Sequence, residues 1–156
     1  MSANAMLMSI KPTYVEKIFS GKKTVELRRT KPKAMAGSPV LVYSSSPQRS
    51  LMGIVYVKRI IEDTPEKMWP RVRAFAGVTK KEFDAYFEGA EKAIAIFIDR
   101  ASCLDSPVAL DELRNLIPRF QPPQSYIYLR DTDPHARTLM NCVIPERFWI
   151  HMGYVC

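Results

Sequence analysis

A change of periodicity at Gly21 is the sequence feature that most constrains the fold. Before it, apolar residues such as Val15 and Ile18 recur at helical spacing. After it, apolar and polar residues alternate over 24–28, which is typical of a strand with one buried face. Glycine readily adopts the left-handed conformation with which many helices end. We therefore expect a short helix over 13–20 that leads almost directly into a strand.

Similar signals divide the rest of the chain into short elements. Two capping-box pairs, Thr13 with Glu16 and Thr79 with Glu82, predict helix starts, and Pro70 predicts a break or kink in a helix that begins after Thr64. The other expected elements are strands over 40–46, 51–61 and 92–99, a helix over 110–117 ended by Pro118, and a last strand within 122–130.

The arrangement of these elements indicates the fold class. The expected strand over 92–99 is apolar on both faces, as in a closed or covered sheet. Gly53 lies inside a strand pattern, where glycine marks a bulge or a close approach of backbone. Because strands are scattered among short helices without regular βαβ alternation, we expect an α+β fold with a small barrel rather than a doubly wound sheet.

Composition limits the size and the partners of the protein. With 156 residues, 47% of them hydrophobic, the chain suits one globular domain. No apolar run approaches the roughly 18 residues of a membrane span and the start lacks a leader pattern, so we expect a cytoplasmic protein. Three cysteines without ligand spacing predict reduced thiols, no metal and no cofactor. The net charge of +7 favours phosphate-bearing partners.

The polar face of the strand at 24–28 is the strongest candidate site. Lys23, Glu26 and Arg28 place two cations and an acid within about 20 Å of extended chain. One interpretation is a solvated ion pair, worth about 0–1 kcal/mol. The other is a binding site, in which Glu26 accepts from a donor on a base or similar amide while Lys23 and Arg28 hold an anion or a carbonyl.

Further polar residues form a second tier of candidates. They are able to line a cleft through hydroxyl and amide groups, or to serve only in turns: Ser44, Ser45, Ser46, Gln124 and Ser125. Tyr126 and Tyr128 share one face of their expected strand, where they either stack on a base or pack in the core. The chain has no GxSxG, HExxH, P-loop or GxGxxG motif.

The spacing Gly21-x-Lys23-x-x-Glu26-x-Arg28 resembles the G-x-K-x-x-E-x-R signature of the ASCH domain, a relative of the PUA RNA-binding domain. The stretches "LMSIKPTYVEKIFSGKKTVELRR", "VYSSSP", "GVTKKEFDAYFEG" and "PPQSYIYL" also look like the longer bacterial and archaeal members. The resemblance covers roughly residues 6–130. It implies a small PUA-like β-barrel flanked by helices, with RNA or a nucleotide-like ligand in a cleft lined by the motif residues.

This resemblance also suggests how the chain is organised. We expect an ASCH domain over residues 1–130, followed by a C-terminal extension over 131–156. The extension has an apolar, aromatic end, so it either packs on the domain or forms a homodimer interface. The function that we expect is an RNA-binding or modified-nucleotide-binding module.

Two other functions remain open from the sequence. Some short members of the family are amidohydrolases that deacetylate N4-acetylcytidine with a lysine, a threonine and a glutamate. Lys23 matches the lysine, but Glu26 occupies the threonine position and the glutamate position falls near Ala76. If the chain is such an enzyme, Thr24 is the substitute nucleophile. Some longer members are described as transcriptional regulators, but no helix-turn-helix pattern follows residue 130.

Overall fold

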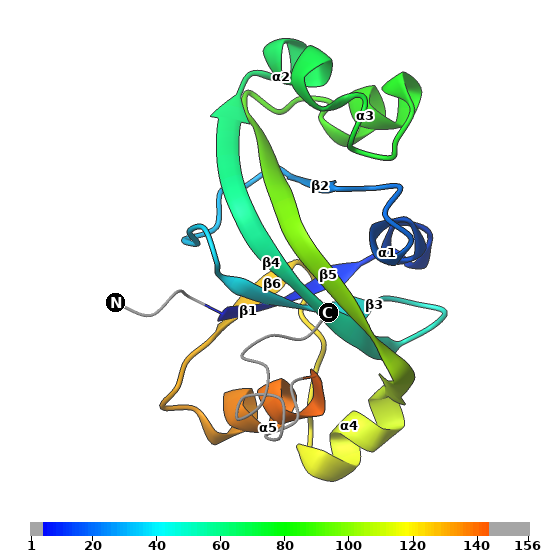
Figure 1. Ribbon diagram of the computed structural model, residues 1–156, viewed down its shortest axis with the longest axis vertical. Coiled ribbons are helices and arrows are strands. Elements are labelled where there is room, and N and C mark those ends of the chain that lie inside the picture. The colour runs from blue at the N-terminus through cyan, green and yellow to red at the C-terminus, as the bar shows by residue number, and fades with distance from the viewer. Residues whose placement is uncertain (1–4, 144–156) are drawn as a thin grey trace.

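The computed structural model describes residues 5–143, which fold around one six-stranded sheet (Figure 1). Its strands are β1 (Ala5–Ile10), β2 (Val25–Arg28), β3 (Pro39–Ser44), β4 (Ser50–Asp63), β5 (Ala93–Ala109) and β6 (Tyr126–Leu129). Its helices are α1 (Pro12–Phe19), α2 (Pro65–Val72), α3 (Lys80–Tyr86), α4 (Leu110–Leu116) and α5 (Pro134–Val143). The strand order is β2-β5-β4-β3-β1-β6. Since β1 pairs with β3 in parallel and the other neighbours are antiparallel, the sheet is mixed and the expected α+β class is confirmed.

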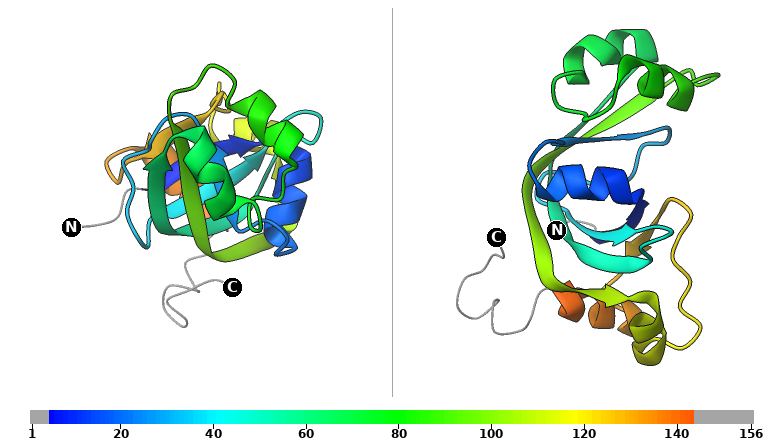
Figure 2. Two further views of the ribbon diagram at one scale, coloured as in Figure 1. Left: turned by 90° about the horizontal axis from the view of Figure 1, so that it is seen from above. Right: turned by 90° about the vertical axis from the view of Figure 1, so that its right-hand side faces the viewer.

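The two long strands β4 and β5 give the sheet its curvature. They bend into an arc with α1 on the concave side, so the sheet forms a half-barrel (Figure 2). Helices α2 and α3 lie at one end of the arc, and α4 and α5 lie at the other (Figure 1). The β4–β5 register shifts at three places, between Leu51 and Gly53, between Tyr56 and Val57, and between Val57 and Arg59. Such irregularities bend a strand and increase its twist.

Both faces of the sheet are buried, as the apolar pattern over 92–99 predicts. Ile94 and Ile96 belong to the cluster that contains α1, whereas Ala93 and Ala95 belong to the cluster under α2 and α3. A third cluster joins the other face of β1 and β3 to α4 and α5. The helices at the two ends of the arc therefore rest on separate apolar clusters.

Several local predictions are confirmed, and one is wrong. Gly21 has a φ of 83°, and Thr79 caps α3 with the full capping box. The Thr13 capping box does not form, because α1 begins one residue earlier, at Pro12, a residue favoured at the first helical position. Pro70 lies within α2, which continues to Val72, so the helix does not break there, and a kink at Pro70 stays a prediction.

The chain after residue 99 differs from the sequence prediction. The strand expected over 92–99 continues to Ala109, because its polar second half pairs with the first half of β4. Beyond residue 130, where no helical pattern is expected, α5 packs Ala136, Leu139 and Val143 into the cluster shared with α4. The division of the chain at residue 130 stays a prediction, and residues 144–156 lie outside the described part. Within the described residues, no helix is long and apolar enough to cross a membrane.

Candidate ligand-binding cleft

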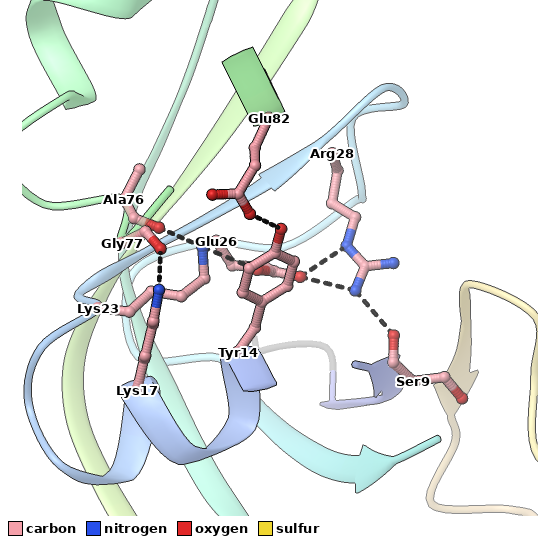
Figure 3. Close-up of polar contacts among 9 residues, drawn as sticks. All are labelled: Ser9, Tyr14, Lys17, Lys23, Glu26, Arg28, Ala76, Gly77 and Glu82. Carbon is pink, nitrogen blue, oxygen red and sulfur yellow. Dashed lines mark hydrogen bonds and ion pairs between the residues drawn. The ribbon is translucent and has the colours of Figure 1, made fainter. Parts of the chain in front are cut away.

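Lys23, Glu26 and Arg28 converge in three dimensions. The Lys23 ammonium lies 3.5 Å from Glu26 Oε1, and the Arg28 guanidinium donates to Glu26 Oε2 from Nη2 at 2.8 Å and from Nε at 3.1 Å. The Glu26 side chain is only 9% exposed. The solvated ion pair that the sequence leaves open is therefore wrong, because this carboxylate is buried between two cations (Figure 3).

Lys23 is fixed by contacts beyond the motif. Its Nζ donates to the Ala76 carbonyl at 2.5 Å and lies 4.9 Å from the centroid of the Tyr14 ring. Its side chain is 1% exposed. Burial lowers the pKa of Lys23, and the charge of Glu26 opposes that shift. The ammonium group thus lies among a carbonyl, a carboxylate and an aromatic ring.

Arg28 connects the two ends of the sheet. It lies on β2, at one end of the strand order, and its Nη2 donates to the Ser9 carbonyl of β1 at 2.9 Å. Its Nη1 donates to Ser125 Oγ at 3.2 Å, just before β6 at the other end. No strand pairing spans this gap among the described strands. A side chain of the signature therefore closes the half-barrel.

A second set of contacts joins α1 to the segment that leads into α3. The Tyr14 hydroxyl donates to Glu82 Oε2 at 3.0 Å, and Lys17 Nζ donates to the Gly77 carbonyl at 2.8 Å (Figure 3). Burial and the negatively charged Glu82 raise the pKa of Tyr14 to about 12. No sequence pattern indicated Tyr14 and Glu82 as cleft residues, or Lys17 as a contact beside them. The helical spacing of Tyr14 and Lys17 placed them on one face, but nothing in the sequence indicated what that face contacts.

Most of these groups line one cleft of about 790 Å³, and Lys17 lies outside its lining. The sequence-predicted residues that line it are Lys23, Glu26, Arg28, Ser45, Gln124 and Ser125. Tyr14, Glu82 and Tyr86 also contribute, from α1 and α3. Carboxylates and cations are both present, so the deep part of the cleft is close to charge balance.

Four predicted residues lie elsewhere. Thr24 is exposed and lies outside the cleft. Its main-chain N–H donates to the Phe75 carbonyl, and its carbonyl accepts from the Ile98 N–H. Ser44 is buried and donates to the Gln48 side chain at 2.8 Å. Ser46 lines neighbouring hollows instead. The rings of Tyr126 and Tyr128 pack edge to face, with their centroids 5.8 Å apart. This contact supports packing, rather than base stacking, as the role of the pair.

A smaller hollow of about 370 Å³ adjoins the cleft and shares Ser9, Ser45 and Gln124 with it. It is also lined by Arg49, Arg114 and Tyr43. The Tyr43 hydroxyl is the one buried side-chain polar atom without a hydrogen-bond partner among the described residues. Arg49 has a φ of 47°, in the left-handed region. No sequence pattern indicated this hollow, since its residues come from four separate segments of the chain.

The described residues contain no group of three or more histidine, cysteine, aspartate or glutamate side chains that is placed to hold a metal ion. The chemical groups that the cleft offers are therefore ammonium, guanidinium, carboxylate, phenol, amide and hydroxyl groups.

Comparison with known proteins gives relatives in sequence and in structure. The chain is 36% identical over 124 residues to the ASCH domain-containing ribonuclease of Zymomonas mobilis, which covers 80% of this chain and 83% of that protein. The crystal structure of ASCH from Zymomonas mobilis superposes with a TM-score of 0.79 at 30% identity, and covers 88% of this chain and 94% of the other. The N-terminal domain of Staphylothermus marinus McrB shares the fold at 14% identity, with a TM-score of 0.56 over 85% of this chain and 91% of that chain. Residues 8–100 match the ASCH domain, so this chain belongs to the ASCH domain family.

Proposed function

We propose that this protein binds single-stranded RNA in the cleft that the signature residues line. The observation that carries the proposal is the convergence of Lys23, Glu26 and Arg28 in one hollow, where a guanidinium, a carboxylate and several hydroxyls face the same space. The net charge of +7 gives a field that attracts a polyanion. The similarity to a protein named as a ribonuclease supports RNA as the ligand class.

The adjoining hollow supplies groups suited to the RNA backbone. Arg49 and Arg114 line it, and arginine suits the bidentate recognition of phosphate. Tyr43 also lines it, and its buried hydroxyl has no hydrogen-bond partner among the described residues. A buried polar group without a partner is unfavourable, and a ligand oxygen would satisfy it. The cleft and this hollow together thus provide room for more than one nucleotide.

RNA cleavage in the same cleft is the second candidate function. The observation that favours it is the 36% identity, over 80% of this chain, to the ribonuclease of Zymomonas mobilis. Cations beside the scissile phosphate would stabilise the charge that develops during phosphodiester cleavage. Incubation of labelled RNA with the protein, with and without a divalent cation, would reveal shortened products on a gel. Intact RNA in both conditions would leave binding as the function.

The binding proposal is tested with two matched lysine variants. Lys11 is exposed and lines the cleft, whereas Lys22 is exposed and lies outside every hollow described here. Both Lys11→Ala and Lys22→Ala remove one charge. We expect Lys11→Ala to weaken binding to a labelled single-stranded RNA and to reduce the slope of log affinity against log salt by about 1. Equal effects of the two variants, or binding that does not change with salt, would reject the cleft as the site.

Two further parts of the functional hypothesis stay proposals. A modified nucleotide is an alternative ligand for the same cleft, and competition between a free nucleotide and RNA distinguishes the two.

A homodimer through the C-terminal segment depends on residues 144–156, which lie outside the described part of the chain, and sedimentation of the full chain tests it. A regulatory role through a helix-turn-helix has no support, because α5 is the one helix after residue 130 in the described part.

A further inference from the structure

Tyr86 is an exposed aromatic residue that lines the cleft beside charged side chains. It ends α3 and is 42% exposed. Five large apolar side chains are exposed among the described residues, and Tyr86 is the only one of them that lines this cleft. Its ring meets Phe87 edge to face, with the centroids 4.8 Å apart, so its position is supported from one side. An aromatic surface held in this way suits a flat ligand.

Tyr86 lines the same cleft as Glu26 and Arg28 of the signature. Burial raises the pKa of Tyr86, and the charges of Arg28 and Glu26 both act on it. Glu82, one turn earlier on α3, lines the same cleft and accepts from the Tyr14 hydroxyl. The α3 wall of the cleft therefore presents an aromatic ring beside Arg28 and Glu26.

The remaining hydrogen-bonding capacity in the cleft fits a neutral ligand with mixed polarity. Four of the five N–H groups of Arg28 are used by Glu26, Ser9 and Ser125, which leaves one donor. Gln124 lines the same space and offers both an amide donor and a carbonyl acceptor. Because the charges of Glu26 and Glu82 balance those of Lys23 and Arg28, this part of the cleft gives a phosphate no net attraction. An edge with both donors and acceptors, such as that of a nucleobase, matches these groups.

We propose that the cleft takes one unpaired nucleobase, which stacks on Tyr86 with its polar edge toward Arg28 and Gln124. This inference rests on the proposed function, because it assigns the base to the cleft and leaves the phosphates to the rim at Lys11 and the adjoining arginines. A base within a duplex is not free to enter, so the protein prefers single strands. The stacking itself is tolerant of sequence, because every base has a flat face.

Two Tyr86 variants separate stacking from packing. Tyr86→Phe keeps the ring, and Tyr86→Leu removes it while an apolar group of similar size remains. We expect Tyr86→Phe to bind single-stranded RNA like the wild type, and Tyr86→Leu to bind about 5- to 100-fold more weakly. Phe75→Leu is the matched control, since Phe75 is 48% exposed and lies outside the cleft. Thermal melting of each variant verifies folding.

An RNA of the same length with abasic riboses gives a readout that does not depend on any variant. We expect the wild type to bind this backbone-only RNA as weakly as Tyr86→Leu binds the normal strand. Equal binding of abasic and normal RNA by the wild type, or unchanged binding by a folded Tyr86→Leu, would overturn the base-stacking inference and leave the RNA-binding proposal intact. Failure of the wild type to bind any RNA would instead overturn the proposed function.

Discussion

The Arg28 guanidinium on β2 donates to the Ser9 carbonyl on β1 at 2.9 Å, across a gap that no strand pairing closes among the described strands. The same guanidinium holds Glu26 with two hydrogen bonds. A residue of the family signature thus has a structural role in addition to the proposed ligand contact. Substitutions at Arg28 are therefore expected to change both stability and binding.

Arg28→Ala should destabilise the fold by about 2 kcal/mol, because it removes the link to Ser9 and leaves Glu26 with Lys23 as its one cationic partner. Urea unfolding of the variant and the wild type measures the difference. Arg29→Ala is the control, since Arg29 is exposed and makes one 3.3 Å bond to the Tyr86 carbonyl. Equal stability of Arg28→Ala and Arg29→Ala would show that Arg28 does not hold the sheet closed.

Tyr14 should make stability depend on pH in the alkaline range. Its pKa is raised from 10.0 to about 12 in the folded protein, so folding favours the neutral phenol. This contribution is fully present below pH 10 and is lost as the pH rises toward 12. We expect the stability advantage of the wild type over Tyr14→Phe to shrink across that range in urea unfolding experiments. The pH-dependent contributions of the other tyrosines are the same in both proteins, so they cancel in this difference. An advantage that stays constant with pH would contradict the raised pKa of Tyr14.

Gly53→Ala should destabilise the protein by about 1–3 kcal/mol. A Cβ at this position would clash with the Ser102 carbonyl and lie 2.8 Å from Cys103 Cα, and these main-chain atoms of β5 have little freedom to move. This close approach confirms the sequence interpretation of Gly53. Gly89→Asn is the matched control, because Gly89 has a φ of 76° and no atom near its Cβ position, and asparagine tolerates that conformation. Comparison of the two melting temperatures tests whether a steric contact at Gly53, rather than the replacement of a glycine as such, destabilises the protein.

Incubation with N4-acetylcytidine should release no cytidine. The Lys23 ammonium already contacts Glu26 and the Ala76 carbonyl, and Thr24 lies outside the cleft. A nucleophile and a general base would therefore both have to come from other residues. Chromatography of the reaction mixture measures the product, and cytidine release that disappears in Lys23→Ala would revive the amidohydrolase hypothesis.

The convergence of Glu26 and Arg28 could be predicted from the sequence, for a physical reason. Strand alternation places Glu26 and Arg28 on one face wherever the strand lies, so their proximity follows from local geometry. Lys23 sits in the turn before β2, where alternation does not apply, and the family spacing identified it. Local rules also identified the Thr79 cap and the left-handed Gly21.

The remaining features depend on contacts between distant segments. Lys23 donates to the main-chain carbonyl of Ala76, 53 positions away. Every residue has such a carbonyl, so the residue type at this position does not indicate the contact. The polar second half of β5 forms a strand because β4 pairs with it, not because of its own pattern. Tyr43 looked like an ordinary strand residue, and only the folded chain shows that its hydroxyl is buried without a partner in the described part.

The bulges in the long strands have a mechanical consequence for the cleft. The β4–β5 register shifts on both sides of Val57, between the part of β4 that pairs with β3 and the part that leads to α2. These two strands carry α2 and α3 away from the rest of the sheet, with α1 on the concave side (Figure 2). The distance between the α3 wall and the rest of the cleft therefore depends on how sharply this ribbon bends at Val57. The width of the cleft and its binding groups are thus set by different residues. Substitutions in this part of β4 and β5 would therefore alter which ligands fit, while the side chains that would bind them stay unchanged.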